Sequence, residues 1–161
     1  MDQSLKTPAT RQLEEQGIPF RIFVHPGPIR SLEQAALERG QEPDQVIRSL
    51  LFRLEKDEYV MVLIAGKRQV SWPMLRQYLG RSRLTMASEA EVLQVTGYPT
   101  GAVSPFGVSQ RIRLLADRSV FVPAEISIGS GLRGVALILQ QDDFRNALVN
   151  CEVVDLVSST T

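Results

Sequence analysis

Arg48 is the first residue whose position suggests chemistry, because it begins an apolar row on a predicted strand. Residues 47–55 are rich in branched and aromatic side chains, and side chains alternate between the two faces of a strand. One face therefore carries Arg48, Leu50, Phe52 and Leu54. A cation at the head of such a row either extends into solvent or lines a cleft that needs positive charge. The pattern alone favours the solvated arginine.

A second candidate is the loop at residues 96–107, TGYPTGAVSPFG, which holds three glycines and two prolines. Glycine lets a backbone approach a ligand closely and proline fixes the chain, so this loop can present preorganised N–H donors to a carbonyl or a developing oxyanion. Composition by itself favours a structural turn. The segment 129–134, GSGLRG, can cradle a phosphate, but it lacks the lysine and hydroxyl residue of a P-loop, so a hairpin turn is the simpler interpretation.

The chain has one histidine, His25, and one cysteine, Cys151. His25 and Ser31 could act as base and nucleophile, yet no G-x-S-x-G elbow is present and a lone histidine is more often structural. Cys151 is predicted to be a buried, inert thiol. One histidine and one cysteine cannot form a zinc cluster, and no carboxylate cluster stands out for magnesium. We therefore expect neither a metal nor a cofactor.

Composition indicates one soluble globular domain over residues 1–161, with 43% hydrophobic and 22% charged residues. The 18 basic and 18 acidic side chains balance, so contacts with an RNA partner would be local. No apolar run approaches the ~20 residues that cross a bilayer. The N-terminus lacks the apolar core of a signal peptide, so a cytoplasmic location without membrane association is expected.

Capping and stop signals predict helices that position these candidates. The predicted helices run from Thr7 to Gly17, Ser31 to Gly40, Ser71 to Gly80 and Ser88 to Gly97, with a last helix from about Asp142. Branched and aromatic runs bounded by turns predict strands at 19–24, 47–55, 58–65, 83–86, 112–116, 119–122, 125–128 and 135–139. The expected fold is α+β, with short helices surrounding one mainly antiparallel, mixed sheet.

Taken in order, these segments resemble the YbaK-like, prolyl-tRNA-synthetase-associated editing domains over nearly the whole chain. Residues 44–50 resemble the family segment D-x-V-x-K-T-L. Residues 96–107 resemble its T-G-Y-x-x-G-x-x-S-P-x-G loop, the most specific of the three matches. Residues 129–134 resemble its G-G-x-R-G turn.

The resemblance implies a deacylase that acts in trans on the acceptor end of a mischarged tRNA carrying a small amino acid, with tRNA-Pro the favoured tRNA and prolyl-tRNA synthetase a candidate partner. The loop would hold the aminoacyl carbonyl, the terminal ribose hydroxyl would assist, and the family lysine would orient the substrate near its phosphate. The implied catalytic residues are Arg48, Gly101 and Ser104. The implied substrate-binding residues are Ser31, Leu50, Val103, Pro105, Phe106, Gly107, Gly131 and Arg133.

Two positions depart from the family pattern. The lysine is replaced by Arg48, and the aspartate that often follows the G-G-x-R-G turn is replaced by Ala136. Arginine keeps the charge and grips phosphate through two parallel bonds, but its guanidinium stays protonated, so a role for a neutral amine is lost. Two alternatives to a working deacylase therefore stay open: a noncatalytic binding module, and a regulatory protein that binds a synthetase or an aminoacyl ligand.

Overall fold

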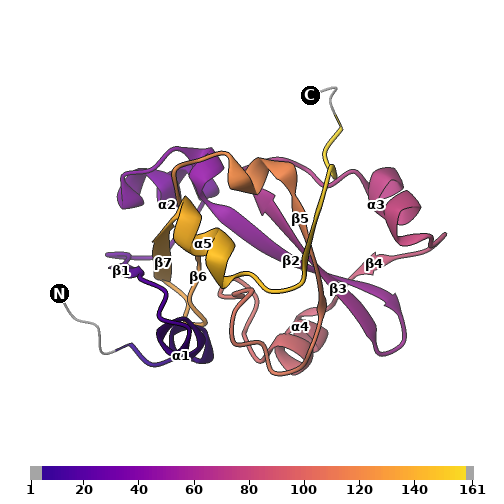
Figure 1. Cartoon of the computed structure of the whole chain (residues 1–161), viewed down its shortest axis with the longest axis horizontal. Coiled ribbons are helices and arrows are strands. Elements are labelled where there is room, and N and C mark those ends of the chain that lie inside the picture. The colour runs from indigo at the N-terminus through magenta and orange to yellow at the C-terminus, as the bar shows by residue number, and fades with distance from the viewer. Residues whose placement is uncertain (1–4, 159–161) are drawn as a thin grey trace.

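The computed structural model describes residues 5–158 as two β-sheets with five short α-helices around them (Figure 1). The predicted domain of 1–161 includes residues 1–4 and 159–161, which lie outside the described residues. Each α-helix has seven or eight residues. A helix that crosses a membrane needs about 20 residues, so none occurs in the described part of the chain.

The larger sheet has five strands in the order β4-β2-β3-β5-β8. Its strands are β2 (Ile47–Glu55), β3 (Glu58–Ala65), β4 (Thr85–Met86), β5 (Arg113–Asp117) and β8 (Cys151–Val154). The hairpin β2–β3 is antiparallel, with Arg48 opposite Ile64, whereas β3–β5 and β5–β8 are parallel. The sheet is therefore mixed, as expected.

The smaller sheet is antiparallel, in the order β1-β7-β6. It comprises β1 (Arg21–Val24), β6 (Glu125–Gly129) and β7 (Val135–Gln140), and lies at the left of Figure 1. A single bridge between Val46 and Ser127 connects it to the start of β2. The sequence predicted one sheet, and this division into two is a correction, because strand order depends on contacts between distant segments.

The helices begin and end where the capping signals predict. They are α1 (Pro8–Glu15), α2 (Leu32–Arg39), α3 (Trp72–Leu79), α4 (Glu89–Thr96) and α5 (Gln141–Ala147). The side chains of Thr7, Ser31, Ser71 and Ser88 each accept a hydrogen bond from a backbone N–H in the first turn. Three of these helices end at left-handed glycines: Gly40, Gly80 and Gly97.

The five-stranded sheet is buried on both faces, which explains why β3 carries an almost unbroken apolar run. One face, with Leu51 and Met61, packs into the main core together with α1, α4, α5 and the small sheet. The other face, with Phe52 and Val62, packs against Leu75 of α3. The alternation predicted for residues 47–55 is therefore confirmed, and it fixes which β2 side chains face each core.

Three local predictions need correction. Residues 119–122 were expected to be a strand but lie largely in the 3₁₀-helix η2 (Arg118–Phe121), because the Asp117 carboxylate accepts hydrogen bonds from the Ser119 and Leu156 N–H groups. The 3₁₀-helix η1 (Pro43–Gln45) was not predicted. Strand β8 was also missed, since its four residues pair only with β5.

Glu152 attaches β8 to the sheet through charged hydrogen bonds. Arg113 donates from Nε at 2.7 Å and from Nη2 at 2.9 Å, and the Tyr78 hydroxyl donates at 2.6 Å. These bonds, chiefly those from Arg113, lower the pKa of Glu152 to about 2. A carboxyl whose pKa is lower in the folded state stabilises the fold above its unfolded pKa and loses that contribution as the pH falls.

We predict that the melting temperature of the wild type falls more steeply between about pH 4.5 and pH 2 than that of Glu152→Gln, because the variant has no carboxylate to protonate. Glu55→Gln is the matched control, since Glu55 is exposed and its side chain forms no hydrogen bond or ion pair within residues 5–158. Thermal melts over this pH range test the prediction. Parallel pH profiles for wild type and Glu152→Gln would contradict it.

Candidate functional site

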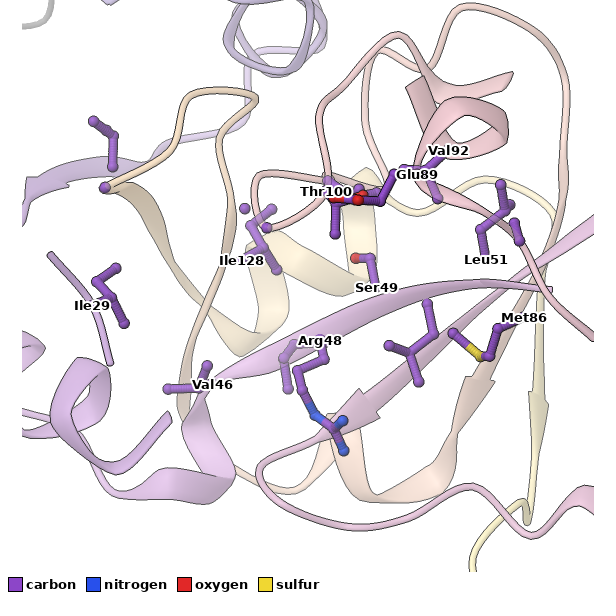
Figure 2. A pocket seen from close by; sticks show the side chains of 18 of the residues that line it. Ile29, Val46, Arg48, Ser49, Leu51, Met86, Glu89, Val92, Thr100 and Ile128 are labelled. Atoms are coloured by element: carbon purple, nitrogen blue, oxygen red, sulfur yellow. The ribbon is translucent and has the colours of Figure 1, made fainter. Parts of the chain in front are cut away.

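A cleft of about 370 Å³ lies along the open edge of β2 (Figure 2). Strand β2 pairs with β3 along its length but with β4 only at Phe52 and Arg53. On this other edge Val46 bridges to Ser127 and the Leu51 carbonyl accepts from Ala87 N–H, so the edge is free only between these two points. Side chains from both faces of the strand can therefore reach the cleft. The remaining walls come from α2, α4, the loop at 100–103, the end of β6 and the start of β7.

The loop over the cleft is held by backbone contacts at several points. Ala102 N–H donates to the Pro99 carbonyl at 3.0 Å, and the Ala102 carbonyl accepts from Gly131 N–H at 2.9 Å. Arg133 Nε donates to the Thr100 carbonyl at 2.9 Å. These bonds tie the loop to the turn between β6 and β7, so the two glycine-rich segments form one structural unit.

Gly129, at the end of β6, makes the closest of these contacts. A Cβ at this position would lie 2.1 Å from the Val103 carbonyl oxygen and 2.9 Å from its carbon. Both atoms belong to the backbone, so neither can turn aside as a flexible side chain would. Glycine is required here by close approach of two chain segments.

Gly101 and Val103 provide donors at the cleft wall. Both residues line the cleft, and their backbone N–H groups donate no hydrogen bond within the described chain. Gly101 has a positive φ of 90°, which glycine adopts without strain. Unpaired, preorganised N–H groups of this kind are suited to a carbonyl oxygen that gains negative charge.

Ser49 places an unsatisfied hydroxyl in the same cleft. Its Oγ is buried and has no hydrogen-bond partner within residues 5–158. In Figure 2 the Ser49 hydroxyl lies on the side of β2 that faces Thr100 and Ile128. A buried hydroxyl without a partner is uncommon, and here it fits a polar group supplied by a ligand.

Arg48 also lines the cleft, but its guanidinium extends away from Ser49, on the other side of β2 (Figure 2). Its Nε donates to the Gly66 carbonyl at 2.7 Å, and its Nη2 donates to the Arg68 carbonyl. Burial lowers the pKa of this half-buried group. Nη1 makes no hydrogen bond in the described chain, so the held guanidinium keeps one nitrogen available.

Four of the residues implied by the sequence resemblance meet at the cleft: Arg48, Leu50, Gly101 and Val103. Seven others lie outside its lining, and their roles in binding or catalysis stay predictions. Of these, Ser31 caps α2, and Pro105 lines a separate groove beside β5. The other five are Ser104, Phe106, Gly107, Gly131 and Arg133.

Packing explains the positions of the loop residues that lie behind the cleft. Ser104 is fully buried, and its Oγ accepts from Phe106 N–H at 3.3 Å, while Phe106 lies in the main core. A Cβ on Gly107 would lie 2.3 Å from the Pro8 carbonyl carbon. A Cβ on Gly131 would lie 2.7 Å from the Tyr98 ring. These residues support the shape of the loop.

The His25–Ser31 pair is not an active site in this structure. His25 is buried, its Nδ1 lies 2.5 Å from Glu38 Oε1, and its Nε2 accepts from Arg39 Nε at 3.0 Å. Cys151 is partly buried rather than fully buried as expected, and burial raises its pKa to about 11, which agrees with an inert thiol. Within residues 5–158, no three His, Cys, Asp or Glu side chains gather as metal ligands. The absence of a metal requirement stays a prediction.

Four polar residues of the cleft were given no role from the sequence: Ser49, Thr100, Arg39 and Glu89. The alternation of side chains along the strand placed Ser49 on the face opposite Arg48, but it did not indicate that the strand edge is open. Arg39 is in the last turn of α2 and Glu89 in the first turn of α4, where such charges are expected from the helix dipole alone.

Comparisons with known proteins place this chain in a family. Residues 26–147 match the family model of the aminoacyl-tRNA editing domain, and the chain belongs to that family. A proline–tRNA ligase from Desulforamulus reducens is 37% identical over 131 residues, covering 81% of this chain and 22% of the ligase. The Escherichia coli K12 multifunctional Ser/Thr-tRNA deacylase ProXp-y is 27% identical over 136 residues, covering 82% of this chain and 81% of the deacylase.

Solved structures share the fold. A proposed trans-editing enzyme for prolyl tRNA synthetase superposes with a TM-score of 0.85 at 24% identity, covering 97% of this chain and all of that one. The hypothetical protein APE2540 gives a TM-score of 0.83 at 22% identity, covering 94% of this chain and all of that one. The α+β fold class is confirmed. The chain spans only about a fifth of the proline–tRNA ligases it matches.

We predict that Gly129→Ala displaces the loop at 100–103, because the added methyl group would overlap the Val103 carbonyl. The expected cost is about 1–3 kcal/mol in the free energy of unfolding, with loss of any activity at the cleft. Gly27→Ala is the control, since its Cβ has no heavy atom within 4 Å. Urea unfolding measures the difference, and equal stability of the two variants would contradict it.

Proposed function

We propose that the chain is an aminoacyl-tRNA deacylase, a hydrolase that cleaves the ester joining a wrongly attached small amino acid to the terminal ribose of a tRNA. The observation that carries the proposal is the cleft itself, where unpaired Gly101 and Val103 N–H groups border the buried, partnerless Ser49 hydroxyl. Membership in the editing family supports the reaction class. A volume of about 370 Å³ is enough to hold an aminoacyl group.

Ester hydrolysis needs stabilisation of the oxyanion that forms when water adds to the carbonyl. The Gly101 and Val103 N–H groups are the proposed donors, since they cost no rearrangement when charge develops. Ser49 would bind a polar group of the substrate, and the apolar side chains of Ile47, Val92 and Ile128 would exclude excess water. Glu89 is the one carboxylate among the cleft's lining residues, and no histidine or lysine joins it, which agrees with assistance from the ribose hydroxyl.

The proposed substrate is a mischarged tRNA-Pro, recognised at its acceptor end, with prolyl-tRNA synthetase as a candidate partner. Similarity to proline–tRNA ligases and to a Ser/Thr-tRNA deacylase supports this choice. The balanced net charge favours local contacts with the tRNA rather than a broad basic surface. Such a substrate makes the cytoplasm the proposed location.

A second candidate function is a binding module that keeps the cleft without turnover. The specific observation in its favour is Arg48, whose Nε and Nη2 are already used by the Gly66 and Arg68 carbonyls. An arginine in that arrangement cannot supply a neutral amine. Under the deacylase proposal, Arg48 instead acts through its charge and its remaining nitrogen.

A panel of mischarged tRNAs tests the deacylase proposal, with ester loss measured against buffer. We predict hydrolysis of at least one tRNA carrying a small amino acid. Arg48→Ala should lower the efficiency by about ten- to a hundredfold, because a charge-assisted contact worth about 1.5–3 kcal/mol is lost. Arg48→Lys should retain much of the activity, since it keeps the charge.

The outcomes separate the two candidate functions. An inert wild type that becomes active in Arg48→Lys would favour the binding module that lost catalysis. An active wild type unaffected by Arg48→Ala would leave the loop as the catalytic element. Thermal melts of each variant are needed, because Arg48 also holds the turn after β3.

We further predict that hydrolysis survives EDTA, since one histidine and one cysteine cannot assemble a zinc site. Initial rates before and after chelation measure this. A loss of activity that added zinc restores would overturn the prediction.

A further inference from the structure

Arg39 is a half-buried guanidinium in the cleft wall that has no carboxylate partner. It lines the cleft from the last turn of α2 and forms no ion pair within residues 5–158. Burial lowers the pKa of Arg39 to about 10, and the nearby charge of Glu38 opposes only part of this effect. The side chain is therefore charged at neutral pH. Keeping such a charge away from water without a counter-ion is unfavourable, and an anion from outside would relieve it.

Neighbouring side chains hold Arg39 in one orientation. Nε donates to His25 Nε2 at 3.0 Å, and Nη1 donates to Ser127 Oγ at 2.8 Å. Because His25 Nε2 accepts a proton donor, its Nδ1 carries the ring hydrogen and donates to Glu38 Oε1. Glu38 also accepts from Gln34 Nε2 at 2.9 Å, so it is occupied away from Arg39.

This arrangement leaves Nη2 of Arg39 available. Its two N–H groups donate to no acceptor in the described chain, whereas Nε and Nη1 are fixed. A guanidinium that is already held by hydrogen bonds within the protein loses little side-chain entropy when it binds an anion, and its planar donors match a phosphate. The free nitrogen is therefore a preorganised anion-binding group beside the proposed reaction site.

We propose that Arg39 binds a backbone phosphate at the acceptor end of the tRNA and thereby positions the aminoacyl ester under the loop. The inference rests on the proposed deacylase function, because that function supplies a substrate with a phosphate next to the reacting ester. Arg39 is a positioning residue in this scheme. The reacting carbonyl itself faces the Gly101 and Val103 N–H groups.

The charges of the cleft also give the substrate a direction. Glu89 lines the cleft from α4 and forms no ion pair in the described chain. Its carboxylate repels a phosphate and attracts the α-ammonium group of the amino acid. Arg39 donates to Ser127, whose backbone bridges to Val46. Figure 2 shows Val46 and Ile29 on one side of Ser49 and Met86 on the other. The phosphate therefore lies at the Val46 end and the amino acid toward α4.

Two substrates that differ only in phosphate test the inference. One is a mischarged tRNA that the wild type hydrolyses, and the other is the matching 3′-aminoacyl-adenosine, which has no phosphate. Arg39→Gln should raise KM for the tRNA by about ten- to a hundredfold with little change in kcat. It should leave hydrolysis of the aminoacyl-adenosine nearly unchanged. Arg39→Lys should recover part of the tRNA affinity.

Arg76→Gln is the matched control. It removes the same charge from α3, outside the cleft, and the Arg76 side chain forms no hydrogen bond or ion pair within residues 5–158. This control should keep the wild-type KM and salt dependence. Arg39→Gln should instead reduce the slope of log KM against log salt concentration by about 0.7–0.9, the value for one phosphate contact.

The results separate failure of the inference from failure of the proposed function. An active wild type whose Arg39→Gln variant changes neither substrate, or impairs both equally, overturns the role of Arg39 alone. A wild type inert on every ester overturns the deacylase. Binding of an acceptor-stem minihelix without an attached amino acid then still tests Arg39. Weaker binding by Arg39→Gln than by Arg76→Gln supports the phosphate contact, and equal binding overturns it.

Discussion

The contact between Gly129 and the Val103 carbonyl determines the shape of the cleft. Two backbones meet there without an intervening side chain, and bonds from Gly131 and Arg133 to the same loop hold them together. The loop is therefore held at a fixed distance from the open edge of β2. Gly101 and Val103 of this loop, whose N–H groups are unpaired, line the same cleft as the buried Ser49 hydroxyl, and the backbone contact fixes this wall of the cleft.

Local chemistry made most of the fold predictable. The capping residues Thr7, Ser31 and Ser88 begin helices at the expected positions, and the hairpin β2–β3 has the predicted bounds. These features depend on neighbours in sequence. Other features depend on contacts with distant segments, which the periodicity of the sequence does not show. These features are the division into two sheets, the pairing of β8 with β5 and the 3₁₀-helix after Asp117.

The candidate site was only partly predictable for a similar reason. Arg48, Gly101 and Val103 could be selected from residue type and family resemblance, and they share one cleft. Ser104 and Phe106 share the same motif, yet the chain turns them into the protein interior. A motif therefore marked a loop that lines the cleft without showing which of its atoms are accessible. Arg39 has no motif at all, because its significance arises from burial without a counter-ion.

Contacts between residues far apart in the sequence constrain the order in which the chain can assemble. Arg39 meets Ser127 across 88 positions, and Thr7 meets the Ser130 carbonyl across 123. During synthesis the β2–β3 hairpin emerges well before the segments that cover its edge, and exposed strand edges are prone to pair with other chains. Strand β6 and the turn that follows it supply one wall of the cleft, so any nascent chain stopped before β6 lacks a complete cleft.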